Sequence, residues 1–126
     1  MSEIIIVDDM ASTRYMISSV LKEEGHNVIE AVDGKDALEK VNPSVKMVIT
    51  DLHMPHINGL ELVKRIRVNP DYKTIPVIMV SSETDELKKT EGRNSGVTEW
   101  IDKPFTAGKI REVVKRFLYQ DSQVII

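Results

Sequence analysis

Ile4-Ile5-Ile6-Val7-Asp8-Asp9 is a short β-branched run that stops at two acids, and it is the clearest indication of the fold in this chain. A run that is apolar on both faces is typical of a central strand in a parallel sheet covered by helices on both sides. The same kind of pattern predicts four further strands, at Val28–Ala31, Met47–Thr50, Pro76–Val80 and Thr98–Ile101. The sequence therefore predicts five short strands.

Amphipathic segments separate these strands. In the first, Ser12 is the expected N-cap and Gly25 the expected end, and the predicted buried stripe is Met16, Ile17, Val20 and Leu21. Three more helices are predicted around Ala37–Val41, around Leu62–Ile66 and over Ala107–Tyr119. The segment Asp85–Gly96 takes the place of a fourth helix in chain order, but Leu87 is its only large apolar residue, so we expect a loosely held helix.

The alternation of strands and helices predicts the fold class. Right-handed βαβ crossovers with short connections give an α/β domain, a doubly wound five-stranded parallel sheet of the (βα)5 type. The chain has 126 residues, and no linker or repeat divides it. We expect one domain.

Composition excludes several classes of protein. The net charge of −3 comes without a basic block, so phosphate-driven nucleic-acid binding is not expected. The chain has no cysteine, which excludes disulfides and thiolate-ligated metals. Neither a signal peptide nor an apolar stretch of membrane-spanning length is present, so we expect a cytoplasmic monomer with no membrane contact.

Polar residues follow the predicted strands at the edge where doubly wound sheets bind ligands. Asp8 and Asp9 follow the first strand, Asp51 the third, Ser81 the fourth and Lys103 the fifth. Clustered carboxylates repel one another unless a cation is present or their pKa values rise. Oxygen ligands of this kind suit Mg²⁺, and an ammonium and a hydroxyl are suited to a phosphoryl group. The pattern indicates a site that makes and breaks an aspartyl phosphate.

These residues carry a family resemblance. The chain resembles the receiver domain of two-component response regulators, and more closely the free-standing CheY-like type. The matching stretches are Ile4-Ile5-Ile6-Val7-Asp8-Asp9, Asp51-Leu52-His53-Met54-Pro55 with Asn58-Gly59, Pro76-Val77-Ile78-Met79-Val80-Ser81-Ser82, and Lys103-Pro104-Phe105. The resemblance implies the flavodoxin-like strand order 2-1-3-4-5, with a receiver domain over 1–120 and a C-terminal tail over 121–126.

The resemblance also assigns roles at the strand ends. It implies that Asp51 accepts the phosphoryl group and that Mg²⁺ is bound by Asp8, Asp9, Asp51 and the backbone carbonyl of His53. Lys103 pairs with the phosphate, and the Lys103–Pro104 bond is expected to be cis.

Four residues are expected to set the switch and its rate. By the same resemblance, Ser81 is the switch hydroxyl and Trp100 stands where the family has a rotating Tyr or Phe. His53 and Glu83 occupy positions that tune hydrolysis of the phosphate. The neighbouring Lys88-Lys89 pair is interpreted as a solvated face.

Other classes fit the same loops less well. A flavin binder of this fold has a Ser/Thr/Gly-rich phosphate loop after the first strand, where Asp8-Asp9 would repel a phosphate. Nucleotide enzymes need a glycine-rich loop, and neither common motif is present. Haloacid-dehalogenase phosphatases need two acids one residue apart, which Asp51-Leu52-His53 does not supply.

The expected function is therefore a phosphorylation-activated switch rather than an enzyme with a separate substrate. A histidine kinase is the expected donor, and a downstream protein is expected to bind the face made by the fourth helix, fifth strand and fifth helix. Chemotaxis is the leading pathway. The alternatives are a phosphorelay intermediate or phosphate sink, and a phosphorylation-independent adaptor of the pseudo-receiver kind.

Overall fold

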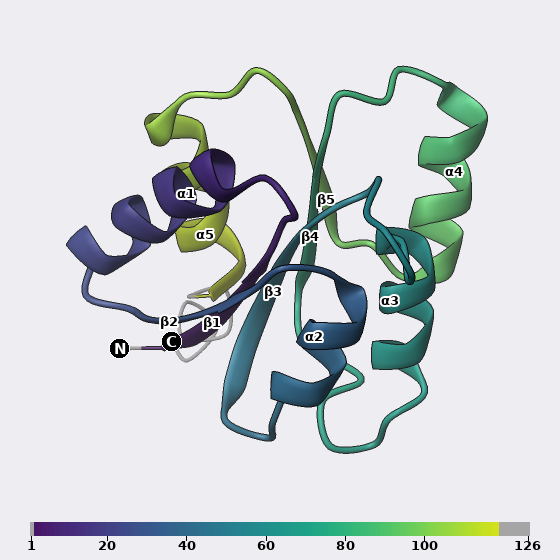
Figure 1. The fold of residues 1–126 in the computed structure, drawn as a ribbon, viewed down its shortest axis with the longest axis horizontal. Coiled ribbons are helices and arrows are strands. Elements are labelled where there is room, and N and C mark those ends of the chain that lie inside the picture. Colours follow the sequence, from purple (N-terminus) through teal and green to yellow (C-terminus); the bar gives the residue numbers. More distant parts are fainter. Residues whose placement is uncertain (1, 119–126) are drawn as a thin grey trace, which may run out of the picture.

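A computed structural model describes residues 2–118, which form one five-stranded parallel sheet with helices on both faces (Figure 1). The strands are β1 (Glu3–Val7), β2 (Asn27–Ala31), β3 (Val45–Asp51), β4 (Val77–Ser81) and β5 (Glu99–Asp102). The helices are α1 (Ala11–Glu23), α2 (Gly34–Lys40), α3 (Gly59–Arg67), α4 (Glu86–Ser95) and α5 (Ala107–Leu118). The strand order β2-β1-β3-β4-β5 confirms the predicted fold class and topology.

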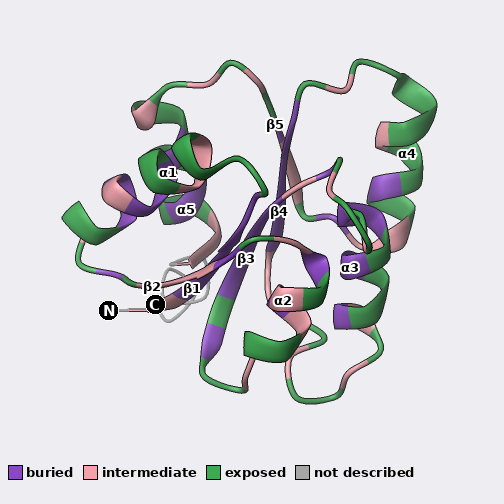
Figure 2. Ribbon diagram, in the orientation of Figure 1, coloured by how far each residue is buried: buried purple, intermediate pink, exposed green. Residues whose placement is uncertain are grey.

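The strands divide their side chains between two helical layers. Helices α1 and α5 cover one face of the sheet, and α2, α3 and α4 cover the other (Figure 1). Alternate residues of β1 follow this division, because Ile4 and Ile6 pack with α1 and α5 whereas Ile5 and Val7 pack on the opposite face. Figure 2 shows the central strands buried over most of their length. Burial on both faces is the reason that these strands are mostly apolar.

Three helices begin with the side-chain caps that their sequences favour. Asp33 accepts a hydrogen bond from the N–H of Asp36 in α2, and Asn58 accepts one from Glu61 in α3. Asp85 caps α4 through the N–H of Leu87. The junctions before these helices are thereby fixed by local contacts.

Helix α1 begins differently, and two predictions about it are wrong. Met10 is its N-cap residue and makes no side-chain cap bond, while Ser12, the predicted cap, already lies inside the helix. Met16 is 38% exposed and does not belong to the buried stripe, which is formed by Ile17, Ser18, Val20 and Leu21. Helix α1 therefore lacks the side-chain cap that α2, α3 and α4 have.

Helix α4 is formed over ten residues, although its sequence pattern is weak. Within Glu86–Ser95, Gly92 is the one buried residue, and Figure 2 shows most of the helix exposed. The helix ends at Gly96, whose φ of 112° is the left-handed conformation typical of a glycine at a helix C-terminus. A helix that contacts its neighbours through a glycine leaves little apolar periodicity to detect.

Arg67, at the end of α3, ties together the amino ends of two strands. Its guanidinium donates to the carbonyls of Lys73 and Ile75 at 2.8 and 2.6 Å, just before β4. It also donates to the Gly96 carbonyl at 3.0 and 2.6 Å and to the Thr98 hydroxyl at 3.4 Å, just before β5. Burial lowers the pKa of this arginine. One side chain thereby joins α3, α4 and the starts of β4 and β5.

Some of the predictions fall on residues that the structure does not describe. Tyr119 of the predicted last helix, the 121–126 tail and the domain boundary at residue 120 all lie outside residues 2–118. Over the described range, none of the helices has both the length and the apolar content needed to cross a membrane.

Candidate functional site

Three carboxylates meet where β1 and β3 end. Asp51 is the last residue of β3, and Asp8 directly follows β1. The two strands are paired in parallel, with Val7 opposite Thr50, so their carboxyl ends lie side by side. Asp8, Asp9 and Asp51 each offer an oxygen atom, and these atoms lie within 4.8 Å of one another. The structure therefore brings together the three acids that the sequence predicted to converge.

Lys103 completes the cluster from β5. Its Nζ lies 3.4 Å from Asp8 Oδ2 and 3.4 Å from Asp51 Oδ2. Its backbone N–H donates to the Ser81 carbonyl at 3.0 Å, and the Lys103–Pro104 bond is cis, as predicted. Three carboxylates and one ammonium leave a formal charge of −2 on the cluster.

Asp8 is the least exposed of the three acids. Its residue is 2% exposed, and burial raises the pKa of its carboxyl group. The N–H of Met10, which donates to Asp8 Oδ1 at 2.8 Å, and the charge of Lys103 lower the pKa, while Asp51 raises it. The folded chain therefore holds a carboxylate where its charge is disfavoured.

The cluster fits a divalent cation. The Asp9 side chain is exposed and forms no hydrogen bond or ion pair with any residue in the 2–118 range, so its oxygens are free to bind a ligand. Carboxylate oxygens with room for water are the ligands that Mg²⁺ prefers, and a charge of −2 is matched by one such ion. The His53 carbonyl stays a prediction as a further ligand.

Local contacts fix Asp51 at the end of β3. The N–H of Leu52 donates to Asp51 Oδ1 at 2.7 Å, and the Thr50 hydroxyl donates to the Asp51 carbonyl at 2.9 Å. Gly59 packs so closely against this carbonyl that a Cβ atom at position 59 would overlap it. The glycine is needed because the loop returns across Asp51.

Ser81, the predicted switch hydroxyl, is the last residue of β4 and is fully buried. Its Oγ accepts a hydrogen bond from the N–H of Glu83 at 3.0 Å. A serine hydroxyl that accepts one bond still has its own proton to donate. Ser81 is thus placed as a donor on the strand beside Asp51.

The two predicted rate-tuning residues are in contact. His53 Nε2 lies 3.1 Å from Glu83 Oε1, so the pair links the loop after β3 to the loop after β4. The hydrogen bond from the Asp85 N–H and that from Lys88 lower the pKa of Glu83 to about 2. Glu83 is therefore an anion at neutral pH, and Lys88, predicted to be solvated, is one of its partners.

Trp100 lies on β5 with its indole against α4. A Cβ atom at Gly92 would come within 2.8 Å of Trp100 Cζ3, so the glycine provides the space for the ring. Lys89 Nζ lies 5.9 Å from the ring centroid and 2.9 Å from Asp102 Oδ1. The Lys89 side chain is 15% exposed, which makes the prediction of a solvated face wrong for this residue. Whether Trp100 rotates stays a prediction.

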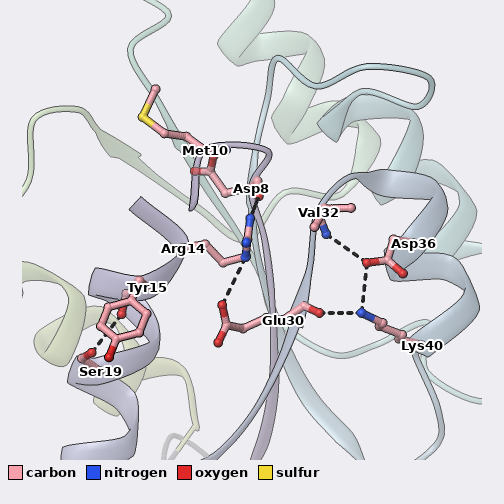
Figure 3. Close-up of polar contacts among 9 residues, drawn as sticks. All are labelled: Asp8, Met10, Arg14, Tyr15, Ser19, Glu30, Val32, Asp36 and Lys40. Carbon is pink, nitrogen blue, oxygen red and sulfur yellow. Dashed lines mark hydrogen bonds and ion pairs between the residues drawn. The ribbon is translucent and has the colours of Figure 1, made fainter. Parts of the chain in front are cut away.

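One residue beside the site was missed by sequence reasoning. Arg14 of α1 donates to the Asp8 carbonyl and to Glu30 of β2 (Figure 3). Arg14 lies three residues before Ile17 and is therefore on the inward stripe of α1. A charged residue on an apolar stripe is the signal that was available, because such a residue needs a buried partner.

The fold and this acidic edge define a class, and comparison with known proteins agrees with it. The model of the response regulator receiver domain family matches residues 4–115. The chain belongs to this family.

Its relatives include chemotaxis proteins. A CheY homolog of Campylobacter jejuni is 37% identical over 119 residues, covering 92% of each chain, and CheY1 of Helicobacter pylori is 37% identical over 113 residues, covering 87% of this chain and 91% of that one. The solved structure of CheY4 of Vibrio cholerae has a TM-score of 0.86 at 36% identity, covering 94% of this chain and 99% of that one. These findings support a response regulator of the CheY-like type, a signalling switch rather than an enzyme with a separate substrate.

Proposed function

We propose that this protein is a cytoplasmic switch, spanning a receiver domain over residues 1–120, that accepts a phosphoryl group on Asp51. The observation that carries the proposal is the convergence of three carboxylates within 4.8 Å with Lys103 between two of them. The donor is a phosphohistidine of a histidine kinase or a small acyl phosphate. An Asp51 oxygen attacks phosphorus in line, the P–N or P–O bond breaks, and its electron pair leaves with the donor.

Asp8, Asp9, Asp51 and the His53 carbonyl hold Mg²⁺ in this proposal. When bound, the ion supplies positive charge that reduces repulsion between the acids and the incoming phosphoryl oxygens. Lys103 provides a second positive charge, already 3.4 Å from the acceptor carboxylate. The chain thus assists its own phosphorylation through groups that are in place beforehand.

Ser81 and Trp100 convert phosphorylation into a change of shape. The Ser81 hydroxyl is buried, so bonding to a phosphoryl oxygen requires the junction between β4 and α4 to shift. That junction carries Glu83 and is continuous with α4, against which Trp100 packs. A new bond at Ser81 therefore favours one arrangement of this segment over another.

The output is binding of a downstream protein at the face made by α4, β5 and α5. This face includes the exposed outer side of α4, and the chain acts there as a monomer. The chemotaxis names of the relatives favour that pathway over a relay intermediate or a phosphate sink. His53 and Glu83 set how long the signal lasts, because their pair lies across the two loops beside Asp51.

The test is intact-mass spectrometry after incubation with acetyl phosphate, with and without Mg²⁺. We expect one phosphoryl adduct that disappears in the Asp51→Asn variant and when the metal is removed. Asp85→Asn, which keeps the cap oxygen of α4, is the matched control and retains the adduct. The absence of an adduct, together with the absence of a beryllofluoride complex, would reject the switch and leave a phosphorylation-independent adaptor.

A further inference from the structure

Arg14 holds the peptide group that joins the two acids of the β1–α1 junction. Its Nη1 donates to the Asp8 carbonyl at 2.7 Å, and its Nε donates to Glu30 Oε1 at 3.1 Å. The side chain is 16% exposed, so both contacts are shielded from water. Figure 3 shows the guanidinium between the end of β1 and the side chain of Glu30.

The Asp8 carbonyl influences the position of Asp9 because it belongs to the Asp8–Asp9 peptide. A peptide unit is planar, so fixing its oxygen also fixes the direction in which the chain enters Asp9. The other groups of Asp8 are already bound: its N–H donates to the Ala31 carbonyl at 3.2 Å, and its carboxylate accepts from Met10. With Arg14 in place, both ends of Asp8 are fixed.

Besides the Arg14 contact, one side-chain bond holds the backbone before this helix, from the Met10 N–H to Asp8 Oδ1 at 2.8 Å. Met10, at the N-cap, makes no side-chain cap bond, and the first turn of α1 contains no acid. The exposed Asp9 forms no hydrogen bond or ion pair with the described residues. The orientation of Asp9 therefore depends on the peptide that precedes it, which Arg14 holds, and on the Asp8–Met10 bond that spans it.

Glu30 keeps the guanidinium in place from the neighbouring strand. Its Cα is paired with that of Ile6 in β1, which anchors it next to the junction. The Glu30 carbonyl accepts from Lys40 Nζ at 2.8 Å, and Lys40 also contacts Asp36 of α2, as Figure 3 shows. Arg14 is thus held by a strand that does not itself carry a site residue.

We propose that Arg14 is a positioning residue for the metal site, which aims the carboxylates of Asp8 and Asp9 toward Asp51. The inference rests on the proposed function, because it assumes that these acids bind a divalent cation. A positioning role and a purely electrostatic role predict opposite changes in cation affinity when Arg14 is replaced. As a nearby positive charge, Arg14 weakens cation binding, so its removal would tighten binding if charge alone mattered. As a positioning residue, it strengthens binding, so its removal weakens it.

The test is a titration with Mn²⁺, a spectroscopically visible substitute for Mg²⁺, in which free Mn²⁺ is measured by electron paramagnetic resonance. For Arg14→Met we expect a dissociation constant roughly tenfold higher, at the lower end of what loss of an outer contact costs a metal site. Arg14→Lys keeps the charge but not the planar two-point contact, and we expect a rise of roughly threefold. Circular dichroism establishes that each variant is folded at the titration temperature.

Arg111→Met is the matched control, since Arg111 also pairs across elements, with Glu24 at 3.5 Å, but lies on α5 away from the acids. We expect its Mn²⁺ affinity to equal that of the wild type. Unchanged or tighter binding by Arg14→Met and Arg14→Lys would overturn the positioning role, and a loss of stability without a change in affinity would make Arg14 purely structural. Failure of the wild type itself to bind Mn²⁺ would instead reject the proposed metal site.

Discussion

Two half-buried arginines lie at opposite edges of the sheet. Both donate hydrogen bonds to backbone carbonyls, but the contacts have different consequences. Arg14 lies at the carboxyl edge and Arg67 at the amino edge, each on the inward side of its helix, and each donates to backbone carbonyls. Arg67 pairs with no carboxylate in the described chain, and its partners are three carbonyls and one hydroxyl. Arg14 makes one bond to a carbonyl and one ion pair, to Glu30.

The difference shows how the two edges are built. At the amino edge the guanidinium supplies donors to the part-buried carbonyls of Ile75 and Gly96, so the contacts serve stability. At the carboxyl edge, acids of like charge are held together, and burial raises the pKa of Asp8. That arrangement costs stability, and in the proposed function a bound cation offsets the cost.

The largest change in the free energy of unfolding is expected when the Arg67 contacts at the amino edge are removed. Arg67→Met removes the donors for the carbonyls of Lys73, Ile75 and Gly96, and it should lower the free energy of unfolding by about 3 kcal/mol, because the part-buried carbonyls of Ile75 and Gly96 lose their partners. Urea denaturation measures this change. Arg65→Met is the control, since Arg65 forms an exposed pair with Glu61, and its effect should stay below about 0.5 kcal/mol.

Metal binding tests whether the amino edge and the carboxyl edge are independent. The folded Arg67→Met protein should bind Mn²⁺ with the affinity of the wild type, because none of its contacts touches the acidic cluster. A change in affinity beyond twofold in this variant would show that the two edges are not independent.

At the carboxyl edge a substitution is expected to increase stability. Asp8→Asn should raise the free energy of unfolding by about 1 kcal/mol at pH 7 in the presence of a chelator, because it removes a buried charge that the fold disfavours. Urea denaturation in chelator and in Mg²⁺ measures it. Adding Mg²⁺ should stabilise the wild type but not the variant, since a ligand stabilises only the state that binds it. A variant less stable than the wild type in chelator would contradict the account of the carboxyl edge.

The pH dependence of this difference follows from the direction of the pKa shift. The pKa of Asp8 is higher in the folded chain than its ordinary value of 3.8, so the folded state binds the proton more tightly than the unfolded state. The stability that the wild type gains from this proton is fully present below pH 3.8 and is lost as the pH rises through the folded pKa. The advantage of Asp8→Asn should therefore appear only above pH 3.8.

The smallest effect concerns Glu83. Its pKa of about 2 comes first from the Asp85 N–H and only second from Lys88. Lys88→Met should therefore raise this pKa while leaving it below the ordinary value of 4.5, as followed by carbon-detected NMR of the Glu83 carboxyl group. A return to 4.5 would show that Lys88, and not the backbone, holds the charge.

Much of the fold was predictable because local and global signals agree. The three central strands, β1, β3 and β4, are mostly apolar because they are buried on both faces, and that pattern can be detected without any contact information. Helix α4 gave a weak signal because its contact with β5 is made through Gly92, where a missing side chain leaves room for Trp100. The start of α1 was misjudged at Ser12, because the cap position falls on Met10, directly after the acid pair.

The site was predictable where residues stand at the ends of strands. Side chains at the carboxyl ends of parallel strands lie on one edge of the sheet, so Asp8, Asp51 and Lys103 could be expected to converge once the family resemblance supplied the strand order. The contact of Arg14 could not, because its two acceptors are a backbone carbonyl and a side chain on another strand. Lys89 was misjudged for the same reason: its partners, Trp100 and Asp102, are on β5. Contacts between residues far apart in the chain leave no regular spacing in the sequence from which they could be predicted.

The indole of Trp100 has a consequence for optical measurements. It is the only tryptophan of the chain, and its Nε1 is buried without a hydrogen-bond partner among residues 2–118. An indole in such surroundings fluoresces at shorter wavelength than one in water. Because the ring packs against Gly92, any movement of α4 away from β5 admits solvent and shifts the emission to the red. The protein therefore carries its own fluorophore for the position of this helix.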